Sequence, residues 1–495
     1  MGKKRASHTR PQAEPPYQRA AAELRQTAST DTPSLFSRSG SPELETTGRV
    51  IMTAVDNDPD AVKRIVRDLK NRAGISNTLT LTAGDESASA SDDVEATVLS
   101  EFGIVIVDAA PDQIVAAESM VQGASAPAKE YCHVEREYYC YTASDIDELQ
   151  PSTTGRTRDY WIGYKAGVSR AVDEILLDFN DKGISETTTP SLSDEGYIPL
   201  DTTADESMVA GQEFTWGLQA TRVSISRLNG QGVKAAVLDT GIDLRHPDFQ
   251  GRIAASRSFV QGLTVQDGNG HGTHCAGTLG GSSTAGTIRY GVAPAVELYI
   301  GKVLNNQGRG REGDVVQGIH WALGQGCRVI SVSIQRRVIK CQVPVSIAYE
   351  TAGANALRRG ALVIAAAGNH SNRQSSQYVP VSAPANCPSI VGVGAISQRR
   401  RLANFTNRAF CKGGDVDFVA PGVDIYSSDV TPNGYRSRNG TSMATPHVSG
   451  IAALIVQQEP GVSGQEIYNQ LRANALGAVG GSTRDFGHGL ARALV

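Results

Sequence analysis

Three short segments of this 495-residue chain carry a carboxylate, an imidazole and a hydroxyl among small residues. Asp239 directly follows the apolar run 234–238, His271 lies in Gly-Asn-Gly-His-Gly, and Ser442 lies in Asn-Gly-Thr-Ser-Met-Ala. If the fold brings them together, these three side chains can perform acyl transfer, in which the histidine takes the proton of the serine hydroxyl. Taken singly, each has a more ordinary role, because aspartate and serine often cap helices.

The segment around the histidine also permits two metal interpretations. Residues 267–278 begin like a calcium-binding loop, but position twelve is Thr278 where such a loop needs a bidentate glutamate. His271 and His274 are three residues apart, yet the chain has no HExxH motif to supply a metal site and a base. Glycines at 268, 270 and 272 instead suit a histidine at a helix start that other backbone approaches closely.

A glycine motif at residues 308–313 resembles a dinucleotide-binding turn. It reads Gly-Arg-Gly-Arg-Glu-Gly, follows a predicted strand and opens a predicted helix. The next strand, however, ends in Ser333-Ile334-Gln335 and offers no acidic residue for a ribose. The pattern therefore does not favour a nucleotide site.

The elements that must position these residues alternate between strands and helices. Apolar strands are predicted at 234–238, 298–304, 328–334, 361–366 and 389–394. Helices are predicted at 272–280, 313–324, 345–359 and 442–457. Continuous apolar strands separated by helices indicate an α/β fold with a parallel sheet covered on both faces. Its chemistry should gather beyond the carboxyl ends of the strands.

The N-terminal part follows a different plan. Residues 1–48 are rich in Ser, Thr, Pro and charge and are predicted to be a disordered arm. Residues 49–144 show the order βαββαβ of a small α+β, ferredoxin-like domain, with Asp58 capping and Pro59 starting its first helix. Residues 145–213 read as a linker with one helix at 161–179, and residues 214–495 as the catalytic domain.

Together the three segments resemble the Asp, His and Ser signatures of the subtilisin-like serine proteases, the subtilases. Their order along the chain is the subtilisin order. A fourth segment, Ala-Ala-Ala-Gly-Asn at 365–369, looks like the family's oxyanion-hole stretch, and the resemblance runs from about residue 215 to the C-terminus. It implies a serine endopeptidase in which Ser442 attacks, His271 transfers the proton, Asp239 orients the histidine and Asn369 binds the oxyanion.

The resemblance also implies how a substrate is bound. Gly308, Arg309 and Gly310 would form the edge at which substrate backbone adds as a strand. Two walls of the pocket for the residue before the cut bond would be Ser333, Ile334 and Gln335 on one side and Ala366, Ala367 and Gly368 on the other. An uncharged residue is expected there. Gln335 departs from the family's usual glycine and would narrow or polarise the pocket, while Arg336 and Arg337 would attract acidic substrate residues.

The N-terminal domain resembles a subtilase propeptide, which acts as intramolecular chaperone and inhibitor and feeds its tail into the cleft. A self-inhibited, self-processing zymogen is thus expected, cut at an undetermined bond between about residues 144 and 212. The alternative is a catalytically silent scaffold with the same fold. No cofactor is expected for catalysis. Structural calcium is possible in this family, but its ligands cannot be assigned from the sequence.

Bulk properties narrow the partners to protein or peptide substrates. The formal net charge is −4 and charged residues make up 20% of the chain, so nucleic acid and anionic membranes are not indicated. No run reaches the ~18 apolar residues of a membrane span. Seven cysteines cannot all pair within one chain, and no apolar stretch follows the basic residues at 3–5. Reduced thiols and an intracellular location are therefore favoured over secretion.

Overall fold

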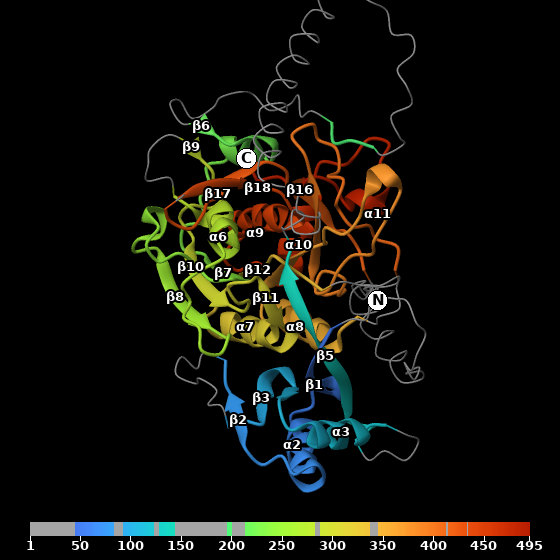
Figure 1. Cartoon of the computed structure of the whole chain (residues 1–495). Coiled ribbons are helices and arrows are strands. Elements are labelled where there is room, and N and C mark those ends of the chain that lie inside the picture. The colour runs from blue at the N-terminus through green and yellow to red at the C-terminus, as the bar shows by residue number, and fades with distance from the viewer. Residues whose placement is uncertain are drawn as a thin grey trace, which may run out of the picture. The chain divides into compact units, whose positions relative to one another are not determined.

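The computed structural model describes residues 45–83, 93–122, 128–143, 196–199, 213–282, 288–336, 345–411, 414–432 and 434–495. The predicted helix at 161–179 and most of the predicted arm and linker lie outside these residues. The described elements comprise a parallel-sheet part and an N-terminal mixed α/β part (Figure 1).

A seven-stranded, all-parallel sheet forms the frame of the C-terminal part, with the order β16-β15-β14-β12-β7-β10-β8. The five predicted strands are present, which confirms the α/β prediction. Sequence analysis missed the two edge strands, β8 and β16. In chain order the strands are β7 (Lys234–Asp239), β8 (Ile253–Ser258), β10 (Glu297–Lys302), β12 (Val329–Val332), β14 (Leu362–Ala366), β15 (Val391–Ile396) and β16 (Phe418–Pro421).

Helices cover both faces of this sheet. One face holds α6 (His271–Gly280) and α9 (Thr441–Gln458), which pack on each other and on the central strands; the other holds α7 (Glu312–Gly324) and α8 (Ile347–Arg358). The remaining elements are α5 (Trp216–Ala220), α10 (Gly464–Asn474), α11 (Thr483–Phe486), β6 (Glu213–Phe214), β9 (Ile288–Arg289), β11 (Arg309–Arg311), β13 (Ile334–Gln335), β17 (Ile425–Ser428) and β18 (Tyr435–Arg438).

The N-terminal part is a sheet with two helices on one face. Its elements are β1 (Thr46–Ala54), α2 (Pro59–Ala73), β2 (Thr78–Leu81), β3 (Ala96–Leu99), β4 (Ile104–Val107), α3 (Pro111–Ser119) and β5 (Cys132–Thr142). The strand order β5-β1-β4-β3 fits the split-βαβ plan, and β2 is an additional strand parallel to β3. The ferredoxin-like assignment and the domain limits stay predictions.

The residues at the two ends of α2 determine where this helix begins and ends. Asp58 has extended backbone and accepts a hydrogen bond from the Asp60 N–H at 2.9 Å, and Pro59 occupies the first helical position, as predicted. Gly74, at φ 70°, ends the helix in the left-handed conformation that glycine tolerates. The apolar side of α2 then buries Val62, Ile65 and Leu69 against the sheet.

The opposite face of the N-terminal sheet packs on α7 and α8. One continuous apolar cluster includes Ile51 and Ile106 from this sheet, Val315 from α7 and Tyr349 from α8. Beyond this contact, β5 continues along the C-terminal part and pairs with β11 and β13 (Figure 1). The strand therefore extends from the N-terminal sheet to the edge at which we expected a substrate to bind.

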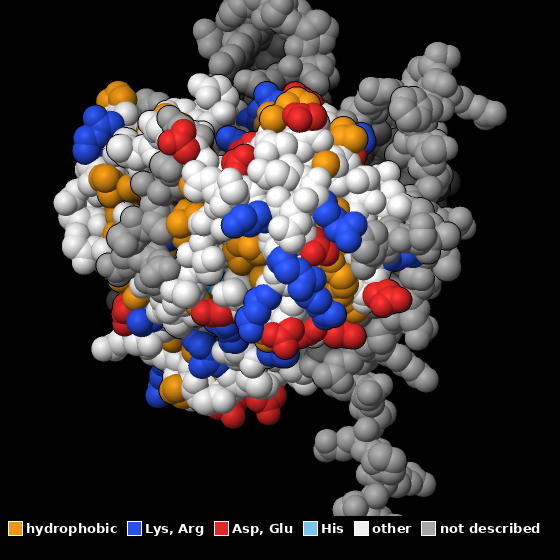
Figure 2. Space-filling view, turned by 90° about the horizontal axis from the view of Figure 1, so that it is seen from below, with side chains coloured by type: hydrophobic (Ala, Val, Ile, Leu, Met, Phe, Trp, Pro, Cys, Tyr) orange, Lys and Arg blue, Asp and Glu red, His pale blue; other side chains and the backbone are white. Residues whose placement is uncertain are grey.

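Charges of both signs are mixed on the surface seen from below. Figure 2 shows Lys and Arg side chains lying among Asp and Glu ones on this face. On α2, Lys63 pairs with Asp60 and Arg64 with Asp58, each at 2.9 Å. None of the helices in the described part of the chain combines the length and hydropathy that a membrane-spanning segment requires.

Candidate active site

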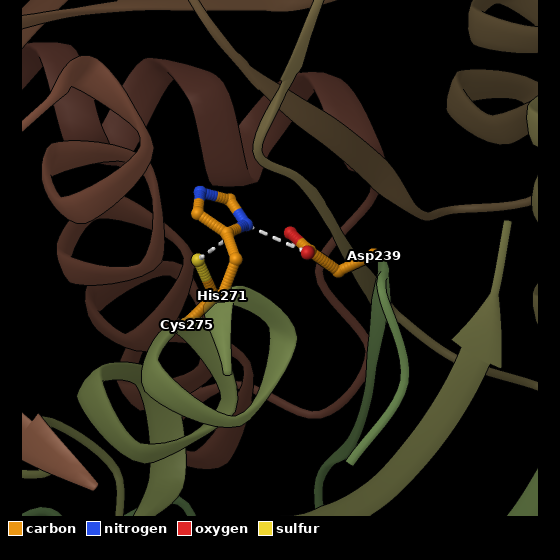
Figure 3. Close-up of side chains that lie close together, drawn as sticks. All are labelled: Asp239, His271 and Cys275. Carbon is orange, nitrogen blue, oxygen red and sulfur yellow. Dashed lines mark hydrogen bonds and ion pairs between the residues drawn. The ribbon is translucent and has the colours of Figure 1, made fainter. Parts of the chain in front are cut away.

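The predicted aspartate and histidine meet at the carboxyl end of the parallel sheet. Asp239 is the last residue of β7 and His271 the first of α6, and His271 Nδ1 lies 2.7 Å from Asp239 Oδ1 (Figure 3). Both side chains are buried. Burial by itself lowers the pKa of His271, but the Asp239 carboxylate outweighs it, and the pKa lies well above its ordinary value.

Glycines on either side of His271 leave room for the groups that pack around it. A Cβ on Gly272 would lie 2.3 Å from the carbonyl oxygen of Gly241, which is far inside van der Waals contact. Gly270, just before the helix, has φ 94°, and a Cβ there would lie 2.2 Å from Asp429 Oδ1. The prediction that small residues let other backbone come close to the histidine is confirmed at Gly272, whereas the group that approaches Gly270 is the Asp429 side chain.

Asp267 fixes the loop that leads into α6. Its Oδ1 accepts from the Asn269 and Gly270 N–H groups at 2.9 Å each, and its Oδ2 accepts from the Thr273 N–H and hydroxyl at 2.9 and 2.7 Å. The Thr240 hydroxyl donates to Oδ1 as well. Because protein donors occupy both oxygens, the structure supports a loop-fixing role for Asp267 and gives no support to the calcium-loop interpretation.

His274 does not form a metal pair with His271. Its Nε2 lies 2.9 Å from the Ile425 carbonyl and 3.0 Å from the Arg436 carbonyl, so it ties α6 to the hairpin β17–β18. The only three-residue group of metal-type ligands in the described ranges is Asp239, His271 and Cys275. A thiol and an imidazole are poor calcium ligands, so this group offers no calcium site.

Ser442 lies at the start of α9, as its sequence context indicates. Its Oγ donates to the Ser333 carbonyl at 3.1 Å. His271 Nε2 is buried and has no hydrogen-bond partner within the described residues, so the hydroxyl and the imidazole are not bonded to each other here. A rotation of the serine side chain is needed to form the nucleophile–base contact, which is often loose before substrate is fully engaged.

Asn369 follows β14 and its amide is oriented by the residue before the serine. Its Oδ1 accepts from the Thr441 N–H and hydroxyl, both at 2.9 Å. This leaves Nδ2 to donate to the carbonyl oxygen of Ala143, to which the Ser442 N–H also donates at 3.4 Å. One peptide carbonyl of the chain itself therefore occupies the place where two donors converge.

Several of the predicted substrate-binding residues contact residues 140–143, the end of β5 and the residue after it, which we call the tail. The Thr142 N–H donates to the Gly308 carbonyl at 2.9 Å, and the Ala143 N–H to the Ser333 carbonyl at 3.3 Å. Arg309 and Gly310 pair with Tyr141 and Cys140 in an antiparallel ladder, and Ile334 and Gln335 pair with Thr142 and Tyr141. A strand of this chain, β5, thus pairs with the edge at which a substrate strand was expected, and the addition of a substrate there stays a prediction.

The second wall is made of buried backbone. Ala366 and Ala367 are fully buried, and Gly368, at φ 106°, donates its N–H to the Thr441 hydroxyl at 3.1 Å. A Cβ on Gly368 would lie 2.4 Å from Asn407 Nδ2 and from Ser382 Oγ. These three residues hold the turn that delivers Asn369, and their part in a specificity pocket stays a prediction.

Gln335 has a role that sequence analysis expected only in part. Its Nε2 donates to the Thr142 carbonyl at 3.2 Å, and its Oε1 accepts from the Asn369 N–H at 3.1 Å. The side chain is buried and bridges the tail to the oxyanion residue. The sequence identified the unusual glutamine, but it gave no indication that its side chain contacts the tail at Thr142.

The oxidation state of the cysteines differs in part from the expected reduced thiols. Among the described residues, five cysteines are free and buried, including Cys275, whose Sγ lies 3.9 Å from His271 Nδ1 (Figure 3). Burial raises the pKa of the Cys275 thiol. Cys411 is disulfide-bonded, so the expectation of reduced thiols is wrong at that position.

Comparison with known proteins identifies the family. The Subtilase family, Peptidase_S8, matches residues 230–489. Subtilisin BL of Lederbergia lenta is 41% identical over 287 residues, which cover 57% of this chain and 98% of that protein. The M-protease of Shouchella clausii (strain KSM-K16) is 40% identical over 293 residues, covering 58% of this chain and 71% of that protein. The chain belongs to the subtilase family and is a subtilisin-like serine endopeptidase.

Proposed function

We propose that the chain is a self-inhibited zymogen that hydrolyses peptide bonds through an acyl-enzyme on Ser442 and first cuts its own Ala143–Ser144 bond. One observation carries this proposal: the Ala143 carbonyl accepts hydrogen bonds from Asn369 Nδ2 and from the Ser442 N–H. Donors aimed at a carbonyl oxygen next to a serine hydroxyl are those that stabilise a tetrahedral oxyanion. The bond after Ala143 is then the bond to be cut.

The chemistry follows from the residues that converge there. Ser442 Oγ leaves the Ser333 carbonyl, gives its proton to His271 Nε2 and bonds to the Ala143 carbonyl carbon. The carbon–nitrogen bond to Ser144 breaks, and the new amine takes the proton from His271. Water then attacks the ester carbon and gives a proton to His271. The bond to Ser442 Oγ breaks, Oγ takes that proton from His271, and Ala143 is released as an acid that ionises to the carboxylate. Asp239 holds the imidazole and stabilises its charged form throughout.

Contacts away from the cut bond support inhibition by the product. Two carboxylates of β5 bind the first turns of two helices: Glu135 accepts from the Ile347 and Ala348 N–H groups at 3.0 and 2.8 Å, and Glu137 from the Gly313 N–H at 2.8 Å. Both carboxylates are at a helix N-terminus, where the helix dipole favours negative charge. These contacts do not depend on the Ala143–Ser144 bond, so the cut N-terminal part can remain in the cleft.

The tail also supports the expected preference for an uncharged residue before the cut. Ala143 occupies that position, and Cys140, four residues before the bond, is fully buried. Tyr141 between them is 37% exposed, so the cleft encloses this side chain less than its neighbours. We expect substrates to be protein segments with small uncharged residues at the first and fourth positions before the cut bond.

Neither a cofactor nor an assigned calcium ion enters this mechanism. The oxyanion donors, the base and the nucleophile are all side-chain or backbone groups of the chain. Structural calcium stays a prediction without ligands.

The silent-scaffold alternative is separated from the zymogen by labelling. Intact mass is measured for the full chain and for Ser442→Ala, each with and without a fluorophosphonate that reacts with activated serines. The proposal predicts that the unmodified chain is cut after Ala143 and gains the probe mass once its N-terminal part has dissociated, whereas Ser442→Ala does neither. A chain that stays both uncut and unlabelled would favour the scaffold.

A further inference from the structure

We infer that the substrate cleft extends beyond the fourth residue before the cut bond and that Arg309 and Arg336 select aromatic side chains at the fifth and sixth. The inference rests on the proposed function, because the tail serves as the bound substrate. With Ala143 as the first residue before the cut bond (P1), Tyr139 is the fifth (P5) and Tyr138 the sixth (P6).

Arg309 forms the contact at the fifth position. Its guanidinium carbon lies 3.6 Å from the centre of the Tyr139 ring, within the range of a cation–π interaction. Its Nη2 pairs with Glu45, while Nε is buried and has no hydrogen-bond partner among the described residues. These side-chain contacts of Arg309 are made with the N-terminal part, and they are lost when that part leaves.

Arg336 forms the contact at the sixth position. Its guanidinium carbon lies 4.9 Å from the centre of the Tyr138 ring, and its side chain is only 3% exposed. Nη1 donates to Glu312 Oε1 at 2.8 Å, whereas Nε and Nη2 have no hydrogen-bond partner in the described part of the chain. Buried N–H groups without an oxygen partner make the ring face an important contact for this guanidinium.

Glu312 adds a backbone contact at this position and holds the Arg336 side chain. Its Oε2 accepts from the Tyr138 N–H at 3.2 Å, while its Oε1 holds Arg336. Because Glu312 Oε1 already accepts from Arg336 Nη1, this arginine is not a free site for an acidic substrate residue. The sequence-based hypothesis that Arg336 attracts acidic residues is therefore replaced by an aromatic preference; Arg337 lies outside the described residues.

The test uses the full chain after it has cut itself and its N-terminal part has dissociated. The substrates are a series of acetylated peptides with a fluorogenic leaving group. The parent hexapeptide is Tyr-Tyr-Ala-Tyr-Thr-Ala; variants carry cyclohexylalanine, leucine or glutamate at the fifth or sixth position, and a tetrapeptide lacks both. Cyclohexylalanine keeps the bulk of an aromatic ring but not its charge distribution. We expect it to lower kcat/KM by about threefold at the fifth position and about tenfold at the sixth.

Substitution of the arginine assigns the effect. In Arg309→Gln, the difference between tyrosine and cyclohexylalanine should vanish at the fifth position and persist at the sixth. Equal kcat/KM for all hexapeptides and the tetrapeptide, or a preference for glutamate, would overturn the inference while leaving the proposed function intact. Failure to cut any peptide would instead count against the proposed function.

A second measurement decides the inference even without catalysis. Hydrogen exchange is followed at the Thr142 and Ala143 amides, which donate to the Gly308 and Ser333 carbonyls. It is measured in Ser442→Ala, which keeps the tail uncut, alone and combined with Tyr138→Leu or Tyr139→Leu. Both additional substitutions should speed exchange several-fold, because the ladder with β5 loses an anchor. Val115→Ala, at an exposed position of α3, is the control and should not change it. Unchanged exchange in both tyrosine variants would contradict the two contacts.

Discussion

Replacing Asn369 should show how much the proposed oxyanion site contributes to the rate. Its Nδ2 is one of two donors to the Ala143 carbonyl, and its Oδ1 accepts the Thr441 N–H and hydroxyl at 2.9 Å each. Asn369→Ala removes the donor and also leaves both Thr441 groups without their acceptor. We expect kcat to fall about 100- to 1,000-fold, the loss typical of removing one oxyanion-hole donor from subtilisin.

The two consequences of the substitution can be separated. Loss of the acceptor should lower the free energy of unfolding by about 1–3 kcal/mol, because Thr441 is buried. Asn369→Asp has the same shape and keeps the acceptor, so it should melt near the unmodified chain. Its carboxylate would face the developing oxyanion, so kcat should fall at least as far as in the alanine variant.

Steady-state kinetics on an uncharged tetrapeptide, together with thermal melting, checks both statements. KM should change little, since the negative charge on the oxygen develops only in the transition state. Asn469→Ala, at an exposed position of α10, is the control and should match the unmodified chain. A variant of Asn369 that raises KM but keeps kcat would refute the oxyanion role.

Three further outcomes follow from the geometry. Asp239→Asn removes the charge that raises the pKa of His271, so the acidic limb of kcat/KM should move to lower pH while the rate falls about 10⁴-fold, as in other serine proteases. Gln335→Gly removes a hydrogen bond to the substrate backbone, so KM should rise about fivefold with kcat nearly unchanged. Burial would raise the pKa of Asp243, but its hydrogen-bond donors lower it, so the stability that this carboxylate contributes is present above about pH 4 and lost as pH falls. Asp243→Ala should therefore lower the melting temperature at pH 7 and lower it less at pH 3. Asp112→Ala, at an exposed position, is the control and should not show this difference.

The sequence predicted the frame because the central strands are mostly apolar. β12 and β14 are buried on both faces, and apolar residues fill every position except Ser331 in β12, so near-continuous apolar runs mark them. The edge strand β8 is only half-buried and reads Ile-Ala-Ala-Ser-Arg-Ser, and the short β16 ends in a proline. Such strands carry a weak pattern, and only pairing with a neighbour reveals them.

The site was predictable where a role depends on local sequence and not where it depends on long-range pairing. The glycines beside His271 and the small residues around Ser442 already indicated in the sequence that neighbouring groups could approach these two side chains closely. Nothing near Ala143 indicates that its carbonyl lies between Asn369 and Ser442, because that contact links residues more than 200 positions apart. For the same reason the proposed cut lies one bond before the range expected from the sequence, and the partners of Gln335 and Arg336 were not foreseen.

The most direct test of the account is the identity of the termini that appear when the purified full chain cuts itself. We expect a first fragment that ends at Ala143 and a second that begins at Ser144, with the Ser442→Ala chain remaining intact under the same conditions. A first cut at another bond, or cleavage of Ser442→Ala at Ala143 without added protease, would contradict it.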